Sequence, residues 1–357
     1  MLSVYKFQAP FSEQFKTASG VIPQRNGFVL TFESDSLIAF GEISPLPGFS
    51  KENPDQILAH LTNDLEIIKE ALNASAPIDT MEEYLGKCPF PSMRFGLSSL
   101  VYDLTAKRNS VSLHEFIAPG SNQIIQANAV LGISSPESLL DKVDDLLNAG
   151  FNTLKCKVGV DPDLEMEALA NIRKRFKSLK IRIDANGSWS TQEAMEYFGL
   201  FSQYDIEYCE QPISAENESD LFKIADESPI PVAADESVRD LESAKRLIES
   251  EKVKILILKP ALFGSISEIA VTKSYAASHG IDVVFTTSFD GVIGRIITAA
   301  LASGLGSQKY AQGLATGNYM IEAALQYPNE IREGKFVLPD KPGIGHPLKL
   351  SELEKII

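Results

Sequence analysis

Cysteine, histidine and tryptophan are scarce in this sequence. Its 357 residues include only three cysteines, four histidines and one tryptophan. Cys88, Cys156 and Cys209 are odd in number and lack metal-site spacing, so we expect buried thiols in a reducing compartment. No stretch of 18 apolar residues occurs, and the first residues show no basic segment followed by an apolar run. These absences predict a cytoplasmic protein without a membrane span and exclude a disulfide scaffold.

Basic residues are also few in comparison with acidic ones. The 33 Lys and Arg stand against 48 Asp and Glu, which gives a formal net charge of −15. This charge repels phosphate backbones and anionic lipid, and no local basic patch offsets it, so we expect neither nucleic acid nor a membrane as partner. The chain is long enough for two or three ordinary domains, or for one barrel with an attachment. The oligomeric state stays open.

The first 120 residues mix strand-like and helical patterns. Short β-like segments come first, around residues 3–8, 27–32 and 37–43. Two helices are expected to follow, one from an apolar stripe over 57–72 and one over 92–107. We therefore predict an α+β domain over residues 1–120. Arg25, next to Gly27 in a loop expected to be mobile, is interpreted as an ordinary exposed arginine, with approach to a bound ligand as the less favoured alternative.

From about residue 121 the pattern becomes a repeat of a short apolar strand and a longer helix. Eight strand-like segments are present, at 127–133, 153–158, 181–185, 207–210, 231–235, 253–259, 282–287 and 310–314. Strands that alternate with helices indicate parallel pairing, and the number eight favours a closed (β/α) barrel over 121–320. No glycine-rich fingerprint follows the first strand, which counts against a dinucleotide-binding sheet. Residues 321–357 are expected to return toward the first domain.

Charged residues lie at or near the ends of five of these strands. They are separated by 27, 26, 25 and 24 residues, about one strand and one helix each, and are Lys157, Asp184, Glu210, Asp235 and Lys259. The carboxyl ends of parallel barrel strands meet at one mouth, so the five side chains should share a space. Any one of them taken alone is more often a solvated rim charge, but the shared position favours an active site.

Three converging carboxylates repel one another unless a cation lies between them. An all-oxygen ligand set suits Mg²⁺, with Mn²⁺ as a substitute, better than zinc or a soft metal. A partly desolvated lysine beside a dication has its neutral form favoured, as a general base requires. A metal that binds a carboxylate substrate stabilises the enediolate formed by deprotonation of the neighbouring carbon. The sequence thus predicts proton abstraction next to a carboxylate in a small-molecule substrate.

The strings around these residues resemble the enolase superfamily, in its muconate-lactonizing-enzyme-like branch. They are KCK at 155–157, DAN at 184–186, EQP at 210–212, DES at 235–237 and KP at 259–260. Within the branch, GEISPLPGFS at 41–50 resembles the capping-domain loop of the o-succinylbenzoate synthase family, which closes over the substrate. The strings TTSFDGVIG at 286–294 and GLAT at 313–316 are also similar to that family's.

The resemblance implies an N-terminal α+β capping domain on the barrel and a reaction of menaquinone biosynthesis. In that reaction, 2-succinyl-6-hydroxy-2,4-cyclohexadiene-1-carboxylate loses water to give o-succinylbenzoate. By analogy Lys157 is the base, and Lys259 stabilises the enediolate from the opposite side. The three carboxylates of Asp184, Glu210 and Asp235 then hold Mg²⁺.

The resemblance also implies supporting roles for further residues. Lys155 contacts the substrate carboxylate or tunes Lys157, and Asn186 and Glu236 support the metal ligands. Ser288 and Gly313 hydrogen-bond the succinyl carboxylate. Pro47 and Gly48 belong to the loop that closes over the substrate. A purely structural role remains open for each of these seven residues, such as helix capping by Ser288 or turn formation by Pro47 and Gly48.

Two other functions remain open. A dipeptide or N-acylamino acid epimerase on the same scaffold also places two lysines on opposite faces of its substrate. Residues 313–317, GLATG, are uncharged, which favours a substrate without an ammonium group. A non-catalytic barrel is a further alternative, which the complete set of acids and lysines disfavours. No histidine lies at a strand end, which argues against relatives that use a histidine base.

Overall fold

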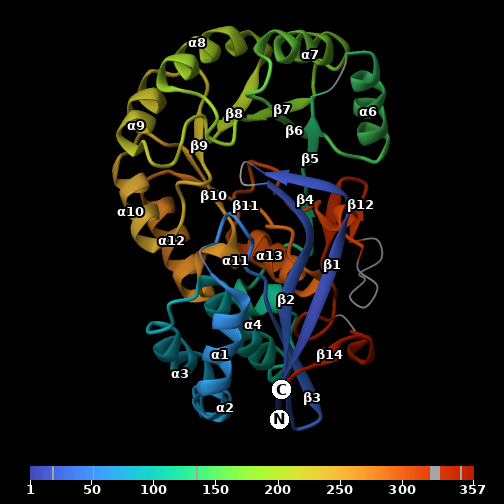
Figure 1. Ribbon diagram of the computed structural model, residues 1–357, viewed down its shortest axis with the longest axis vertical. Helices are drawn as coiled ribbons and strands as arrows, with labels where there is room; N and C mark the ends of the chain where they lie inside the picture. Colours follow the sequence, from blue (N-terminus) through green and yellow to red (C-terminus); the bar gives the residue numbers. More distant parts are fainter. Residues whose placement is uncertain (18–19, 51, 134–135, 322–329, 346–347) are drawn as a thin grey trace.

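The computed structural model has two parts, an α+β capping domain and a parallel barrel (Figure 1). The capping domain occupies the lower half of Figure 1 and the barrel the upper half, and both chain termini lie at the lower end. The structure describes residues 1–17, 20–50, 52–133, 136–321, 330–345 and 348–357.

A four-stranded antiparallel sheet forms one layer of the capping domain. Its strands run in the order β14-β1-β2-β3, with bounds β14 (Glu354–Lys355), β1 (Leu2–Thr17), β2 (Gly20–Ser34) and β3 (Leu37–Ile43). Asp35 and Ser36 connect β2 to β3 with φ of 50° and 66°, as a tight hairpin turn requires. The β1–β2 hairpin extends upward to the barrel, where Phe11 forms a bridge with Met320 (Figure 1).

Five helices pack on this sheet or lead away from it. They are α1 (Pro54–Asn63), α2 (Leu65–Asn73), α3 (Pro77–Leu85), α4 (Pro91–Arg108) and α5 (Leu113–Ile117). The prediction of one helix over 57–72 is wrong, because the chain breaks at Asp64, whose carboxylate accepts a hydrogen bond from the Tyr84 hydroxyl of α3. Helix α4 lies very close to β3, since a Cβ on Gly41 would come within 2.2 Å of the Gly96 carbonyl oxygen.

Seven parallel strands form the barrel wall in the order β11-β10-β9-β8-β7-β6-β5. Their bounds are β5 (Ala129–Gly132), β6 (Thr153–Lys157), β7 (Lys180–Asp184), β8 (Ile206–Glu210), β9 (Val232–Ala234), β10 (Ile255–Leu258) and β11 (Asp282–Phe285). A separate small sheet contains β4 (Ile124–Gln126), β12 (Ile331–Arg332) and β13 (Lys335–Val337). The fold class predicted from the sequence, a (β/α) barrel with an α+β capping domain, is confirmed.

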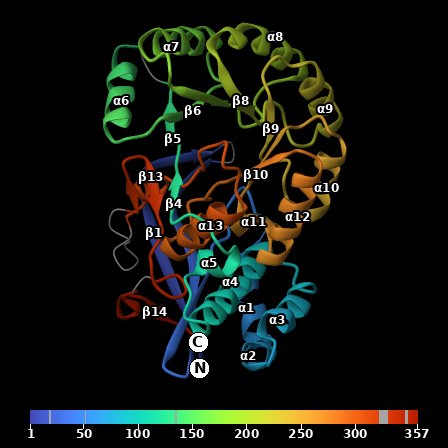
Figure 2. The same ribbon diagram turned by 180° about the vertical axis from the view of Figure 1, so that it is seen from behind.

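Helices connect the barrel strands and cover their outer face, as the view from behind shows (Figure 2). They are α6 (Pro136–Asn148), α7 (Pro162–Arg175), α8 (Thr191–Phe201), α9 (Glu218–Glu227), α10 (Leu241–Glu249), α11 (Pro260–Phe263), α12 (Ile266–Ser278) and α13 (Val292–Leu305). Short 3-10 turns occur at Ser202–Tyr204, Gly317–Tyr319 and Leu350–Glu352. Capping boxes fix the first turns of α8, α10 and α12.

The eighth segment differs from the strand expected over 310–314. It closes the barrel through only two single bridges, from Gln312 to Ala127 and from Gly313 to Thr286. The Gln312 side chain replaces part of the missing strand ladder, because its Oε1 accepts from the Phe285 N–H. Its Nε2 donates to the carbonyl oxygens of Ser307 and Tyr310. A side-chain amide thus satisfies backbone groups that a regular strand would pair.

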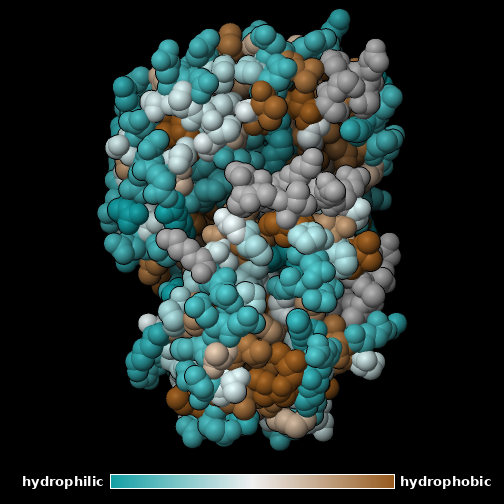
Figure 3. Space-filling view, viewed as in Figure 1, coloured by the Kyte–Doolittle hydropathy of each residue, from teal (hydrophilic) through white to brown (hydrophobic). Residues whose placement is uncertain are grey.

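Apolar side chains fill the layer between the barrel strands and helices, and a second core lies between the capping sheet and its helices. The three cysteines are buried and free, as the sequence predicts. Hydrophilic side chains cover most of the outer barrel helices in the view of Figure 3. Within the described part of the chain, no helix is long and apolar enough to cross a membrane.

Candidate active site

The five charged residues predicted from strand spacing come together at one end of the barrel. Lys157, Asp184 and Glu210 are the last residues of β6, β7 and β8. Asp235 directly follows β9, and Lys259 directly follows β10. Because the strands are parallel and neighbours in the sheet, all five lie at its carboxyl edge. In the sheet, the three strands that lead to the acidic residues, β7, β8 and β9, lie between β6 with Lys157 and β10 with Lys259.

Ion pairs connect these residues across the barrel mouth. The Lys155 ammonium lies 3.0 Å from Asp184 Oδ2 and 2.8 Å from Glu210 Oε1. The Lys157 ammonium lies 2.7 Å from the same Asp184 oxygen, and Lys259 pairs with Asp235. The three carboxylates are 0%, 2% and 4% exposed, whereas the Lys157 side chain is 40% exposed. Lys157 therefore has access to the open mouth that its buried partners lack.

The pKa shifts show how strongly these charges depend on one another. Burial, together with the negative charge of Asp184, raises the pKa of Glu210 to about 8. Burial also raises the pKa of Asp235, although the Lys259 charge opposes this effect. Burial alone would raise the pKa of Asp184, but the adjacent Lys155 and Lys157 charges outweigh it and hold that pKa below its usual value. Burial and mutual repulsion thus oppose ionisation of Glu210 and Asp235, and a cation beside these carboxylates would favour their charged forms.

The chemistry of the donor set, though not its present spacing, fits a hard divalent cation. Three carboxylates converge from adjacent strand ends, and repulsion between them contributes to the raised pKa of Glu210. Their donors are all oxygen, as Mg²⁺ prefers. Among the described residues no three acidic, cysteine or histidine side chains stand together so as to hold a metal directly. The ammonium groups of Lys155 and Lys259 bind these carboxylates instead.

Asn186 and Glu236 extend this network beyond the carboxylates. Lys157 Nζ donates to Asn186 Oδ1 at 2.7 Å, and Asn186 Nδ2 donates to Glu236 Oε1 at 3.1 Å. The Asn186 N–H donates to Asp184 Oδ1 at 2.9 Å. Asn186 has φ of 46°, a left-handed conformation that asparagine tolerates better than most residues. Asn186 thus orients both Lys157 and Asp184.

Gln211 is a site residue to which sequence reasoning assigned no role. It is fully buried, with φ of 38°. Its Oε1 accepts from the backbone N–H groups of Asp235 and Ser237, and its Nε2 donates to the Ser237 hydroxyl. Gln211 therefore fixes the strand end that carries Asp235. The available signal was the position of Gln211 between the strand-end acid Glu210 and Pro212.

The capping loop reaches the barrel mouth. Pro47 and Gly48 are exposed and form a turn, in which Gly48 has φ of 83° and the N–H groups of Phe49 and Ser50 donate to the Leu46 carbonyl. The Phe49 ring, 42% exposed, has its centroid 5.7 Å from Lys259 Nζ. Phe49 is therefore the capping-loop side chain in contact with the site, a position that the sequence did not reveal.

Ser288 and Gly313 lie on the seventh and eighth segments, and both already take part in internal hydrogen bonds. The Ser288 hydroxyl donates to Asp290 Oδ1 at 2.6 Å. The Gly313 N–H donates to the Phe285 carbonyl at 2.8 Å. A Cβ on Gly313 would come within 2.3 Å of Thr286 Oγ1, so the close approach of these segments requires glycine there. Substrate binding by either residue stays a prediction.

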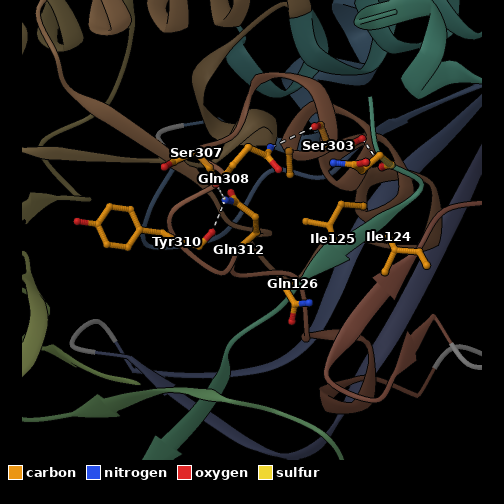
Figure 4. A pocket seen from close by; sticks show the side chains of 10 residues that line it. Ile124, Ile125, Gln126, Ser303, Ser307, Gln308, Tyr310 and Gln312 are labelled. Carbon is orange, nitrogen blue, oxygen red and sulfur yellow. Dashed lines mark hydrogen bonds between the residues drawn. The ribbon is translucent and has the colours of Figure 1, made fainter. Parts of the chain in front are cut away.

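A separate pocket of about 70 Å³ lies at the other end of the barrel (Figure 4). It is formed by β4, the end of α13 and the residues that lead into the eighth segment. Gln308 and Gln312 use their side-chain amides there to bind carbonyl oxygens of Ser303 and Tyr310. Its volume suits ordered water and is too small for a ring-sized substrate.

Two family models match this chain, one over each part of the fold. The fold defines the class as a capped (β/α)-barrel protein with an acidic site between lysines. Residues 138–352 match the family model described as Enolase C-terminal domain-like, and residues 1–104 match MenC, N-terminal domain. The chain belongs to the enolase superfamily, in its muconate-lactonizing-enzyme-like branch.

Similar proteins have several activities. The D-Ala-D/L-Ala epimerase of Cytophaga hutchinsonii is 29% identical, covering 72% of this chain and 71% of that protein. An o-succinylbenzoate synthase of Desulfotalea psychrophila is 25% identical, covering 88% and 93%. Muconate lactonizing enzyme from Pseudomonas fluorescens has the same fold, with a TM-score of 0.87, 20% identity and coverage of 99% and 98%. A dipeptide epimerase from Cytophaga hutchinsonii, solved with Mg and D-Ala-L-Val, gives a TM-score of 0.84 at 25% identity, covering 99% and 98%.

Proposed function

We propose that the protein is a Mg²⁺-dependent o-succinylbenzoate synthase, a carbon–oxygen lyase. Its substrate would be 2-succinyl-6-hydroxy-2,4-cyclohexadiene-1-carboxylate and its product o-succinylbenzoate. The observation that carries the choice of substrate is the match of residues 1–104 to MenC, N-terminal domain, since this domain supplies the loop above Lys259. The strand-end lysines on either side of buried carboxylates support the class of chemistry.

Lys157 carries the proton in this proposal. In its neutral form it takes the proton next to the ring carboxylate, and the C–H electron pair becomes part of the new ring double bond. The C–O bond on the same face of the ring then breaks, and the Lys157 ammonium returns the proton to the departing hydroxide, which leaves as water. Asp184 and Asn186, which lie within hydrogen-bond distance of Lys157 Nζ, orient this nitrogen for both steps. Lys157 is regenerated, so atoms and charge balance.

Lys259 lies across the barrel mouth from Lys157. Its ammonium would face the ring and stabilise the negative charge that develops there, with a cation–π contribution as the ring becomes aromatic. Asp184, Glu210 and Asp235 would hold Mg²⁺, which when bound supplies positive charge to the substrate carboxylate. Lys155, buried between two of these carboxylates, would contact the substrate carboxylate or tune Lys157.

An epimerase of dipeptides or N-acylamino acids is the second candidate. The epimerase relatives, two of them 29% identical, favour it. The lysine pair favours it too, because deprotonation on one face and reprotonation on the other uses two lysines. The uncharged sequence GLATG at 313–317 favours the synthase, because it contains no acidic side chain that could bind a substrate ammonium.

An ultraviolet assay separates the two candidates. Purified protein is mixed with the cyclohexadiene substrate and Mg²⁺, and loss of diene absorbance is followed with and without a chelator. Rapid turnover that the chelator abolishes and added Mg²⁺ restores supports the synthase. If the diene persists while dipeptides or N-acylamino acids take up deuterium at the α-carbon in a Mg²⁺-dependent way, the epimerase replaces it.

A further inference from the structure

A buried polar cluster lies where the capping domain meets the barrel, behind the residues that face the site. Arg25 and Glu42 come from capping strands β2 and β3, and Asp290 and Gly291 come from the barrel segment that leads from β11 into α13. The sequence predicted an exposed Arg25, which is wrong: its side chain is 0% exposed. A buried guanidinium needs fixed partners, since desolvation of an unpaired charge is costly.

Arg25 binds three backbone carbonyls on two different segments. Its Nη2 and Nη1 donate to the Ser44 and Pro45 carbonyls at 2.9 and 2.7 Å, at the start of the capping loop. Its Nε donates to the Phe289 carbonyl at 3.0 Å, on the barrel segment. The planar fork of an arginine reaches all three, which a lysine ammonium does not reproduce. Arg25 thus connects the capping loop to the barrel segment that carries Ser288.

The barrel segment that Arg25 binds contains a strained backbone conformation at Phe289. Phe289 has φ of 56°, a left-handed conformation that is rare for an aromatic residue. Its ring packs edge-on against Phe11 of the β1–β2 hairpin and Tyr319. Contacts from the capping domain therefore surround the strained residue on both its backbone and its side chain.

Glu42 caps a barrel helix from the capping domain. Its Oε1 accepts from the Gly291 N–H at 2.6 Å and its Oε2 from the Gly294 N–H at 2.9 Å, at the start of α13. Gly291 is the N-cap residue of this helix and has no side chain to cap it. A Cβ on Gly291 would come within 2.8 Å of Glu42 Oε2, so glycine leaves room for the incoming carboxylate. Glu42 also accepts a hydrogen bond from the Ser44 hydroxyl.

We propose that Arg25 and Glu42, here called the interdomain clasp, are positioning residues for substrate binding. The clasp sets the relative position of residues 44–50, which carry Phe49, and residues 286–291, which carry Ser288. Neither clasp residue contacts the reacting atoms; each acts through a segment at the barrel mouth. The inference deepens the proposed function, because it rests on these two segments facing the substrate.

The test compares Arg25→Lys and Glu42→Gln with the wild-type full-length protein. The control is Arg173→Lys, because Arg173 also donates to several backbone carbonyls, including those of Leu179 and Asp205, just ahead of β7 and β8 at the amino end of the strands. Loss of a charge-assisted hydrogen bond that holds the substrate segments should raise KM for the cyclohexadiene carboxylate about tenfold. The dissociation constant for Mg²⁺ should not change.

Amide hydrogen exchange provides a readout that needs no substrate. In both clasp variants, exchange should become faster in residues 44–50 and 286–291, and should stay at the wild-type rate in the barrel strands. In Arg173→Lys, KM and exchange in these two segments should equal those of the wild type. Should Arg25→Lys fail to fold, Glu42→Gln, which preserves side-chain volume, provides the same comparison.

Two outcomes would overturn the inference. One is an unchanged KM in both clasp variants; the other is a loss of thermal stability in these variants without faster exchange in the two segments. Failure of the proposed function looks different: the wild type itself leaves the diene intact. In that case KM is measured with the dipeptide or N-acylamino acid that takes up deuterium at its α-carbon. The amide hydrogen exchange of the protein is measured as before.

Discussion

At the scale of single residues, the barrel mouth is governed by charge balance. Three nearly inaccessible carboxylates lie among three lysines, and burial with mutual repulsion raises the pKa of Glu210 to about 8. Lys155 binds Asp184 and Glu210 together, whereas Lys157 shares Asp184 and extends toward the open mouth. This difference in exposure suits Lys155 to holding charge in place and Lys157 to exchanging a proton with a substrate.

Replacing the proposed base should remove catalysis without unfolding the protein. Lys157→Ala is expected to lower kcat by about 10²- to 10⁴-fold, the usual contribution of general acid–base catalysis, as measured by the diene assay. Lys180→Ala is the matched control, since Lys180 begins β7 at the other end of the barrel and pairs with Glu207 at 3.4 Å. Full dehydration activity in Lys157→Ala would exclude this residue as the base.

Removing one carboxylate charge should weaken Mg²⁺ binding. Glu210→Gln keeps the side-chain volume, and we expect its dissociation constant for Mg²⁺, measured by calorimetry, to rise at least about 100-fold. Residues that only support metal ligands already contribute about 10- to 100-fold. Glu207→Gln, on the same strand but paired with Arg182, should bind Mg²⁺ like the wild type. Equal affinities in the two variants would contradict the proposed ligand set.

At the scale of secondary structure elements, the barrel is a repeat in which one unit is incomplete. Seven segments form strands with parallel ladders, and the eighth forms two single bridges at Gln312 and Gly313. Apolar periodicity predicted a strand there, because periodicity reports which residues are buried and not which backbone groups are paired. Gln312 supplies the pairing through its side chain. The start of α1 follows a local rule, because the Asn53 side chain accepts from the Asp55 N–H and caps the helix.

The role of Gln312 can be measured through stability. Gln312→Ala leaves the buried Phe285 N–H without its acceptor, and we expect the free energy of unfolding to fall by about 1–3 kcal/mol. Denaturant unfolding followed by circular dichroism would measure this change. Gln308→Ala is the control, because Gln308 is exposed and should change stability by less than about 0.5 kcal/mol. A similar small effect in both variants would show that the Gln312 amide does not support the barrel closure.

At the scale of the whole molecule, distant parts of the chain meet in the capping domain. The Asp103 carboxylate of α4 accepts hydrogen bonds from the N–H groups of Phe40 and Ile344. Ile344 lies 241 positions from Asp103 in the sequence. The last residues return to the first strand, where β14 pairs with β1 and the Ile356 N–H donates to the Val4 carbonyl. The described C-terminal residues thus divide: β14 joins the capping sheet, whereas β12 and β13 form a sheet with β4 beside the barrel. We propose that the boundary between the capping domain and the barrel lies near residue 120.

Truncation of the C-terminal residues tests this arrangement. A chain that ends at Leu353 loses β14 and the apolar contacts of Ile356 and Ile357 with the capping core. We expect the midpoint of thermal unfolding to fall and the free energy of unfolding to decrease by about 1–3 kcal/mol. The affinity for Mg²⁺ should not change. Glu354→Ala with Lys355→Ala is the control, because it keeps the backbone of β14. A truncated chain as stable as the wild type would show that β14 contributes little.

The sequence by itself determined the class of fold and which charged side chains meet at the barrel mouth. Lys157, Asp184, Glu210, Asp235 and Lys259 follow from spacing alone, because one strand and one helix have a nearly constant length and bring each strand end to the same mouth. The burial of the cysteines and the absence of a membrane-spanning helix among the described residues also follow from local composition.

Only the tertiary structure decided which residues hold this core in place. Gln211, Phe49, Arg25 and Glu42 have contacts with residues distant in sequence: Arg25 binds Phe289, 264 positions away, and Glu42 binds Gly291, 249 positions away. No periodicity records such contacts, since they depend on how two parts of the chain pack against each other. An arginine beside a strand reads as exposed until the other part of the chain supplies the carbonyl oxygens that bury it.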